Sequence, residues 1–126
     1  MATRALTVTN INEILFRGQV RSFQWTGLTK ATDDDGDPAG LGYAWYTDKS
    51  VQVTGTFGTG GSVRIEGSND GTNYAVLADA QGNALDITTA KIEEISAAVL
   101  YIRPRITAGD GTTNLAVTIA AFARPT

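Results

Sequence analysis

Short segments in which apolar and polar residues alternate recur along this chain, and corners rich in Gly, Asn and Asp separate them. A period of two places the apolar side chains of a strand on one face, where they can enter a core. Many short strands joined by tight turns are typical of an antiparallel sandwich or barrel. The chain has 126 residues, the length of one domain. The sequence therefore predicts an all-β fold, an antiparallel β-sandwich, as a single domain spanning residues 1–126.

The predicted strands are segments rich in β-branched and aromatic residues. They cover residues 4–9, 13–16, 20–25, 51–57, 63–67, 74–78, 84–88, 101–107 and 115–123. Residues 91–100 have apolar residues at helical spacing, but the segment is short, and we predict a strand followed by a loop. Residues 30–42 are polar, lack periodicity and form a predicted loop.

The most regular part of the sequence predicts a hairpin between residues 51–57 and 63–67. Alternation puts the apolar residues of both segments at odd positions, and a Gly-rich corner joins them. A three-residue loop would place Phe57 opposite Val63. This register is favoured because a slip of one residue would turn one apolar set toward water.

A second hairpin is predicted between residues 101–107 and 115–123. Pro104 lies inside the first of these segments and has no N–H for a ladder hydrogen bond. We therefore expect its strand to lie at an edge or to turn the proline nitrogen outward.

The corner Ser68-Asn69-Asp70-Gly71 raises a choice between a binding site and a turn. Asn and Asp suit the central positions of a turn, and Gly accepts a positive φ. That chemistry closes a hairpin between residues 63–67 and 74–78 without any ligand. We interpret the corner as a turn, with a ligand role as the alternative.

Four carboxylates surround Gly36 and form the acidic loop: Asp33, Asp34, Asp35 and Asp37. Ca²⁺ takes several oxygen ligands of this kind. The helix-loop-helix calcium signature fails, because a Gly occupies the position where it requires a bidentate Glu. We expect a solvated loop in which replacing Asp33, Asp34 and Asp35 by Asn changes thermal stability little, and an occasional cation site is the alternative.

Composition excludes several kinds of chemistry. The chain contains neither His nor Cys, so it lacks the usual general base, the usual zinc ligands and thiol nucleophiles. Its net charge is −3, and Arg103 and Arg105 form the only close pair among scattered basic residues. We expect no enzyme activity, no cofactor, no metal, no nucleic-acid partner and no membrane association. No signal peptide is apparent, so synthesis in a cytoplasm is expected.

Aromatic residues gather around residues 43–46. Tyr43, Trp45 and Tyr46, together with Trp25, suit either a core or subunit interface, or a platform on which a sugar stacks. Packing is the interpretation we favour.

From Trp25 onward the order of motifs resembles a family of small structural proteins of tailed bacteriophages. The likeness is densest in "DKSVQVTGTFGTGGSVRIEGSNDGTNYAVLADAQGNAL" and "YIRPRITAGDGTTNLAVTIAA". It implies a non-enzymatic virion protein, made in the bacterial cytoplasm. The role that the resemblance implies is that of a head decoration (cement) protein, which binds the major capsid protein on the outer head surface. "GSNDGTNY" and "YIRPRI" resemble more loosely the jelly-roll sandwich of discoidin-like and carbohydrate-binding modules. That likeness implies a jelly-roll-like fold and an alternative function, carbohydrate binding or adhesion on a tail or spike.

Residues 1–20 lie outside the dense resemblance and have two interpretations, an arm reaching a neighbour or the first strand of the sandwich. Capsid lattices offer threefold positions, so a homo-oligomer, and specifically a trimer, is expected. The predicted interface residues are apolar or aromatic: Leu6, Val8, Ile11, Ile14, Leu15, Phe16, Tyr43, Trp45 and Tyr46.

Overall fold

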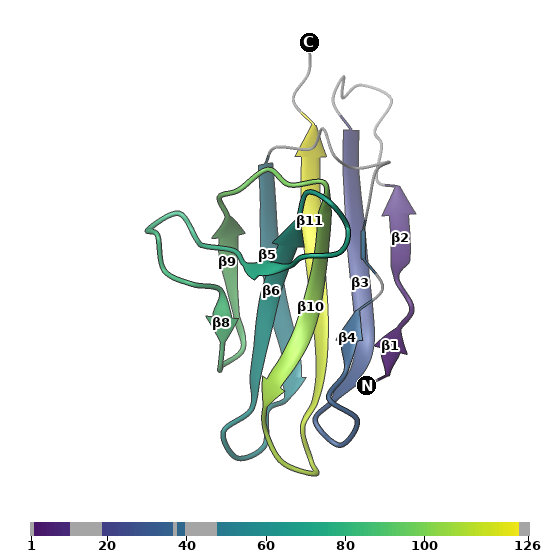
Figure 1. The fold of residues 1–126 in the computed structure, drawn as a ribbon, viewed down its shortest axis with the longest axis vertical. Coiled ribbons are helices and arrows are strands. Elements are labelled where there is room, and N and C mark those ends of the chain that lie inside the picture. The colour runs from purple at the N-terminus through teal and green to yellow at the C-terminus, as the bar shows by residue number, and fades with distance from the viewer. Residues whose placement is uncertain (1, 11–18, 37, 40–47, 124–126) are drawn as a thin grey trace.

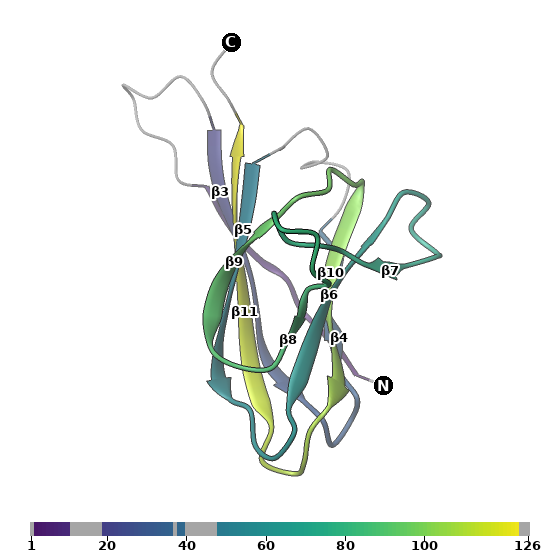
Figure 2. The same cartoon turned by 90° about the vertical axis from the view of Figure 1, so that its left-hand side faces the viewer.

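The computed structural model describes residues 2–10, 19–36, 38–39 and 48–123. Within these residues the regular secondary structure consists of β-strands alone, and the strands form two sheets. The sheets lie face to face as two layers, which are seen edge-on in Figure 2. The predicted all-β sandwich is confirmed, and its pairing is antiparallel apart from one short parallel pair at an edge.

The first sheet, sheet A, has the strand order β1-β4-β10-β6-β7, and β8 also pairs with β6 (Figure 1). The pair β1–β4 is the parallel one. The strands of sheet A are β1 (Thr3–Arg4), β4 (Asp35–Gly36), β6 (Ser62–Ser68), β7 (Ala75–Val76), β8 (Asp86–Ile87) and β10 (Tyr101–Ala108).

The second sheet, sheet B, has the strand order β2-β3-β11-β5-β9, and its pairs are antiparallel. Its strands are β2 (Thr7–Asn10), β3 (Gln19–Thr29), β5 (Asp48–Thr56), β9 (Lys91–Ile95) and β11 (Asn114–Ala123). From β5 onward the chain crosses repeatedly between the sheets, since β5, β9 and β11 belong to sheet B whereas β6 and β10 belong to sheet A. This alternation is jelly-roll-like.

The core lies between the two sheets and is built by the period-two pattern. In sheet B, Val51 and Val53 are fully buried while the intervening Gln52 is exposed. In sheet A, Ile65 and Ile106 enter the same core from the opposite side. Fully burying an aliphatic side chain of this size contributes about 1.5–3 kcal/mol. The sequence pattern therefore identified the inward positions correctly.

The predicted hairpin between residues 51–57 and 63–67 is wrong. Its two segments, β5 and β6, are consecutive in the chain but lie in different sheets. Val53 pairs with Val117 of β11, and Val63 pairs with Ile106 of β10. Alternation specifies which side chains face the core, and it is satisfied equally by two strands side by side and by two strands that face each other across the sandwich.

The predicted hairpin between residues 101–107 and 115–123 is wrong for the same reason, because β10 lies in sheet A and β11 in sheet B. Of the two alternatives expected for Pro104, the edge position is wrong, since β10 lies between β4 and β6. Pro104 is tolerated because it stands opposite Ile65, whose N–H donates away from β10 to the Leu85 carbonyl at 3.0 Å. No ladder donor toward β6 is therefore required at this position.

Most of the remaining strand predictions are confirmed. Residues 63–67 and 74–78 do form a hairpin, with Glu66 opposite Val76 in the β6–β7 pair. Strand β9 followed by a loop confirms the prediction for residues 91–100. The predictions for residues 20–25 and 84–88 are confirmed by the longer β3 and the shorter β8, and residues 4–9 divide between β1 and β2. The predicted strand at residues 13–16 lies outside the described residues.

Candidate functional site

The acidic loop follows β3 and is the first candidate site; its Asp35 belongs to the short strand β4, inside the segment 30–42 predicted as a loop, and Asp37 lies outside the described residues. The expectation of a solvated loop is wrong for two of its carboxylates. Asp34 is 0% exposed and Asp35 is 6% exposed. Asp34 accepts hydrogen bonds from Arg4 Nε at 2.7 Å, from the Thr29 N–H at 2.8 Å and from the Thr32 hydroxyl. This carboxylate joins the β1 strand to the turn that follows β3.

The pKa of Asp34 reflects opposed causes. Burial alone would raise the pKa, but the hydrogen bonds from Thr32, Thr29 and Arg4 outweigh it and hold the pKa of this carboxyl below its ordinary value. Asp33 points outward, pairs with Lys30 and has a φ of 48°. A left-handed backbone is one that Asp and Asn tolerate.

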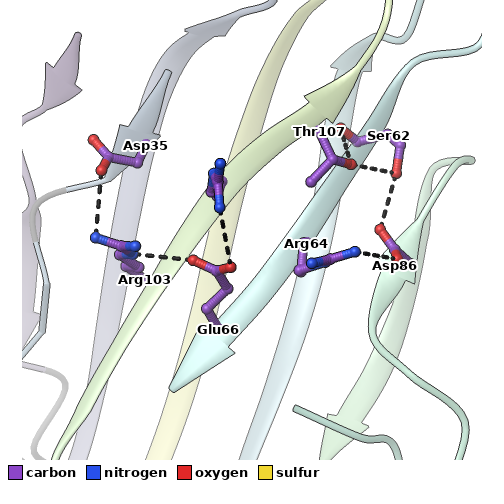
Figure 3. A network of polar contacts seen from close by, with 8 residues as sticks. Asp35, Ser62, Arg64, Glu66, Asp86, Arg103 and Thr107 are labelled. Carbon is purple, nitrogen blue, oxygen red and sulfur yellow. Dashed lines mark hydrogen bonds and ion pairs between the residues drawn. The ribbon is translucent and has the colours of Figure 1, made fainter. Parts of the chain in front are cut away.

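A chain of ion pairs crosses the outer face of sheet A at Glu66, which is 3% exposed. Arg103 Nε donates to Glu66 at 3.1 Å, and Arg103 also reaches Asp35 at 3.4 Å (Figure 3). Arg105 lies 3.7 Å from the second oxygen of Glu66. The Arg103 guanidinium also stacks over the Tyr74 ring, 3.8 Å from its centroid. One buried carboxylate thus holds two guanidiniums of β10 on this face.

A second set of polar contacts lies on the same face beside the first (Figure 3). Arg64 donates to Asp86 at 3.2 Å, and Ser62 donates to the other oxygen of Asp86 at 3.1 Å. Thr107 in turn donates to the Ser62 hydroxyl at 3.1 Å. These contacts tie β8 and β10 to the first residues of β6.

The corner at residues 68–71 is a turn, as we interpreted it. Ser68 accepts from the Gly71 N–H at 2.9 Å, and Asp70 accepts from the N–H groups of Thr72 and Asn73 at 2.8 and 2.7 Å. The hydrogen bonds from Asn73 are the main cause that holds the pKa of Asp70 well below its ordinary value. The Ser68 and Asp70 side chains therefore close the loop itself, while Asn69 Oδ1 accepts from the Leu100 N–H at 3.1 Å.

A second turn carboxylate, Asp110, joins two loops at the same end of the sandwich. Its oxygens accept from the Thr59 N–H at 2.9 Å and from the Thr112 N–H at 2.9 Å. Thr59 lies in the β5–β6 connection and Asp110 in the β10–β11 connection, which lie side by side in both ribbon views (Figures 1 and 2). The Thr112 side chain is the first cause of a pKa well below the ordinary value for Asp110. Asp110 thus fastens together the two connections that cross between the sheets.

We expect Asp110→Ala to release the Thr59 amide, because that N–H loses its acceptor. The measurement is amide hydrogen exchange by NMR, in which Thr59 should exchange faster while the amides of β6 stay protected. Asp70→Ala is the matched control, since it removes an exposed turn carboxylate at the other end of β6. Unchanged exchange at Thr59 in Asp110→Ala, or equal acceleration in both variants, would contradict this role.

The outer face of sheet B differs in character from that of sheet A. Its outward positions follow from the register. Apart from Asp48 at the start of β5, those on the central strands β3, β5 and β11 include a set of small or uncharged side chains: Ser22, Gln24, Thr26, Ser50, Gln52, Thr54, Ala116, Thr118 and Ala120. Among the outward positions that the structure describes on this face, Asp48 and Glu94 are the charged ones. We call this surface the uncharged face. Phe122, 40% exposed, lies at one end of it.

Few of the predicted interface residues fall within the described residues. Leu6 is partly buried and packs against the core, while Val8, on the edge strand β2, is 36% exposed. The other predicted interface residues lie outside the described residues: Ile11, Ile14, Leu15, Phe16, Tyr43, Trp45 and Tyr46. Trp25, considered as part of a sugar platform, is 0% exposed in the core and cannot stack on a ligand.

Sequence reasoning missed the ion pairs of sheet A, although a signal was present. Arg64 and Glu66 alternate with buried residues of β6, and Arg103 and Arg105 do so in β10. The parity of both segments therefore placed these charges on the outer face. The pairing of β6 with β10 could not be predicted, because the two segments are about forty residues apart in the chain and alternation does not specify a partner strand.

Among the described residues, no group of three or more His, Cys, Asp or Glu side chains is placed to hold a metal ion. Nor does this part of the chain contain a helix with the length and apolar character that crossing a membrane requires.

Comparisons with known proteins give a likeness in fold. No family model matches the sequence, and no curated protein matches it. The SPBc2 prophage-derived protein YomS has a TM-score of 0.65 at 11% identity, over 89% of this chain and 100% of that one. An RmlC-like cupin from Desulfovibrio desulfuricans has a TM-score of 0.39 at 7% identity, over 97% of this chain and 85% of that one. A cupin 2 domain-containing protein from Halorhodospira halophila has a TM-score of 0.40 at 11% identity, over 97% and 71%. The first likeness shows the fold alone, and the two cupin likenesses carry no argument.

Proposed function

We propose that this chain is a non-enzymatic structural protein of a tailed-bacteriophage virion, and specifically a decoration protein on the outer surface of the head. The fold it shares with a prophage-derived protein supports a phage origin. The motif order from Trp25 onward, which resembles small phage structural proteins, supports the same assignment. Its partner would be the major capsid protein.

The observation that carries the proposal is the uncharged face of sheet B. It extends over neighbouring strands of one sheet and presents small hydroxyl, amide and methyl side chains. Such a face can pack closely on another protein without desolvating charges, which is the costly part of burying a polar surface. The core of a protein interface is likewise depleted of charged residues.

The carboxylates of the described residues support a packing role over a catalytic one. Many of them accept hydrogen bonds that hold turns and strands together: Asp34, Asp70, Asp79, Asp86 and Asp110. A general acid or base must instead be free to exchange a proton with a substrate. A low carboxyl pKa, as at Asp70 and Asp110, suits a fixed acceptor.

The edges of sheet B support self-association in addition to binding the shell. The β9 edge carries Lys91, Glu93 and Glu94, and charged side chains of this kind oppose strand pairing with another chain. The β2 edge has the sequence Thr-Val-Thr-Asn and carries no charge. We propose a homo-oligomer, with a trimer as the form that threefold positions of a capsid would accept.

Replacing Gln52 by Arg should abolish binding to phage heads. Gln52 is exposed on the uncharged face between Thr118 and Ile92 in the register, so a guanidinium there would be desolvated on docking. The measurement is cosedimentation with heads assembled from the major capsid protein of the same phage. Thr88→Arg, at an exposed position that follows β8, is the control and should bind as the unaltered protein does.

The outcomes separate the alternatives. Loss of binding in Gln52→Arg alone supports docking through the uncharged face. Equal binding by both variants would refute this face as the docking surface. No binding of the unaltered protein to heads, with binding to purified tails or to glycans, would refute the decoration role and favour adhesion.

A further inference from the structure

Two arginines stand directly opposite each other on the outer face of sheet A. Arg64 of β6 and Arg105 of β10 are partners in the antiparallel register. Like charges at directly opposed positions of neighbouring strands repel and destabilise a sheet. Such a pair is compatible with a stable sheet when negative charge lies close to both guanidiniums.

The protein provides part of that negative charge to either side of the pair. Arg64 turns to Asp86 at 3.2 Å, and Arg105 approaches Glu66 at 3.7 Å. Glu66 is shared, because Arg103 holds its other oxygen at 3.1 Å. The Arg105 contact with Glu66 is longer than a hydrogen bond. On its other side Arg105 stands opposite Asp35 of β4 in the register, and Asp35 pairs with Arg103.

An open polar pocket lies beside the arginine pair. Its lining combines the two guanidiniums with the Lys30 ammonium from the β3–β4 turn and with Thr107 of β10. Asp33, which pairs with Lys30, is the carboxylate of this lining. Three cationic side chains and one carboxylate line the pocket itself, and the carboxylates that pair with the two arginines, Asp86 and Glu66, are outside its lining.

Both arginines of the pocket lining have hydrogen-bond donors that the contacts above leave unused. Arg64 Nε is buried and has no hydrogen-bond partner in the part of the chain that the structure describes. Within that same part, the Arg105 contact with Glu66 is an ion pair of 3.7 Å and leaves the forked N–H groups of its guanidinium available. Arginine side chains present these donors in a planar fork that matches two oxygens of one anion.

We propose that this pocket binds an oxyanion, through Arg64 and Arg105 with Lys30 at its rim. The ligand is a carboxylate, sulfate or phosphate group whose oxygens lie between the two opposed arginines and offset their repulsion. A doubly charged anion is favoured, because it competes better with Asp33 for Lys30. The group can come from a free ion or from an acidic side chain of a partner protein.

Titration with inorganic sulfate, at ionic strength held constant with sodium chloride, tests the proposal. NMR spectra should show saturable shifts of the Lys30 and Thr107 amides and of the Arg64 and Arg105 Nε–H signals. Arg105→Gln and Arg64→Gln should each weaken binding by about tenfold or more, as expected for the loss of charge-assisted hydrogen bonds. Dispersed spectra of both variants establish that they are folded.

Lys91→Gln is the matched control. The Lys91 and Arg105 side chains are both 43% exposed, and each has a carboxylate at 3.7 Å, but Lys91 lies on the edge of sheet B. Absence of saturable shifts with sulfate and with an acetylated triglutamate peptide would overturn the proposal, as would equal weakening by Lys91→Gln and Arg105→Gln. Binding of sulfate alone indicates a free ion as the source, and binding of the peptide indicates an acidic partner; both support the oxyanion site.

Discussion

Replacing Asp34 by Asn is expected to lower the free energy of unfolding by about 3 kcal/mol, because a buried, multiply hydrogen-bonded carboxylate is lost. Asp34 is 0% exposed, and Arg4 Nε and the Thr29 N–H donate to it. An amide in its place would turn its NH₂ toward one of these donors and would leave the Arg4 charge without its partner. For a domain of this size the melting temperature should fall by roughly 10 °C.

Asp33→Asn is the control for this measurement. It removes the neighbouring carboxylate, but Asp33 is exposed and its positive φ of 48° is one that Asn accepts. Thermal unfolding of this variant should match that of the unaltered protein closely, as is usual for surface changes. Equal melting temperatures for Asp34→Asn and Asp33→Asn would show that the buried contacts of Asp34 contribute nothing.

Asp34→Asn should also change how the free energy of unfolding depends on pH. The folded protein holds the pKa of Asp34 below its ordinary value, so Asp34 contributes stability above the unfolded-state pKa of about 3.9. That contribution is lost as the pH falls through the lower folded-state pKa. Stability measured from pH 5 downward should therefore decline less steeply in Asp34→Asn than in the unaltered protein. The remaining slope comes from other carboxyls with lowered pKa, such as Asp70 and Asp110.

Replacing Gly36 by Ala should destabilise the fold by ~2–3 kcal/mol through overpacking. A Cβ at this position would lie 2.5 Å from Pro104 Cδ and 2.7 Å from Cδ1 and Nε1 of the Trp25 indole. Both neighbours are rigid rings, and Trp25 is 0% exposed, so neither can move aside cheaply. The close approach of β4 to β10 and to the core therefore requires glycine.

Gly111→Ala tests whether this effect is specific to the close approach. A Cβ at Gly111 meets nothing within 4 Å, and its backbone is outside the left-handed region. Chemical denaturation followed by tryptophan fluorescence should show a lower midpoint for Gly36→Ala and an unchanged midpoint for Gly111→Ala. If Gly36→Ala unfolds at the same denaturant concentration as the unaltered protein, the ring contacts at Gly36 do not limit the packing.

The sequence predicted local properties well. Alternation in residues 51–57 and 101–107 identified the side chains that enter the core, and turn chemistry at residues 68–71 identified a closed corner. Both properties depend on residues within a few positions of one another. The β6–β7 hairpin was predictable for the same reason, because its strands are joined by that corner.

The acidic loop shows where local reasoning failed. A run of Asp residues beside Gly and Pro has the composition of a solvated loop, and Asp33 behaves in that way. Asp34 does not, because Arg4 reaches it from a distant part of the chain, while Thr29 and Thr32 donate to it from close by in sequence. A buried charge requires such partners, and no pattern within the loop itself reports the approach of Arg4.

By itself, the sequence determined most of the strands that the structure describes, though not β4, the inward face of the regularly alternating ones, and the kinds of chemistry that lack of His and Cys removes. Only the tertiary structure decided which strands pair, since β5 and β6, and likewise β10 and β11, cross between sheets where the pattern allowed hairpins. The physical reason is that burial of an apolar face is satisfied by any partner surface, whereas backbone pairing selects one neighbour on each side. The opposed Arg64 and Arg105 exist only through that selection, and so does the pocket beside them.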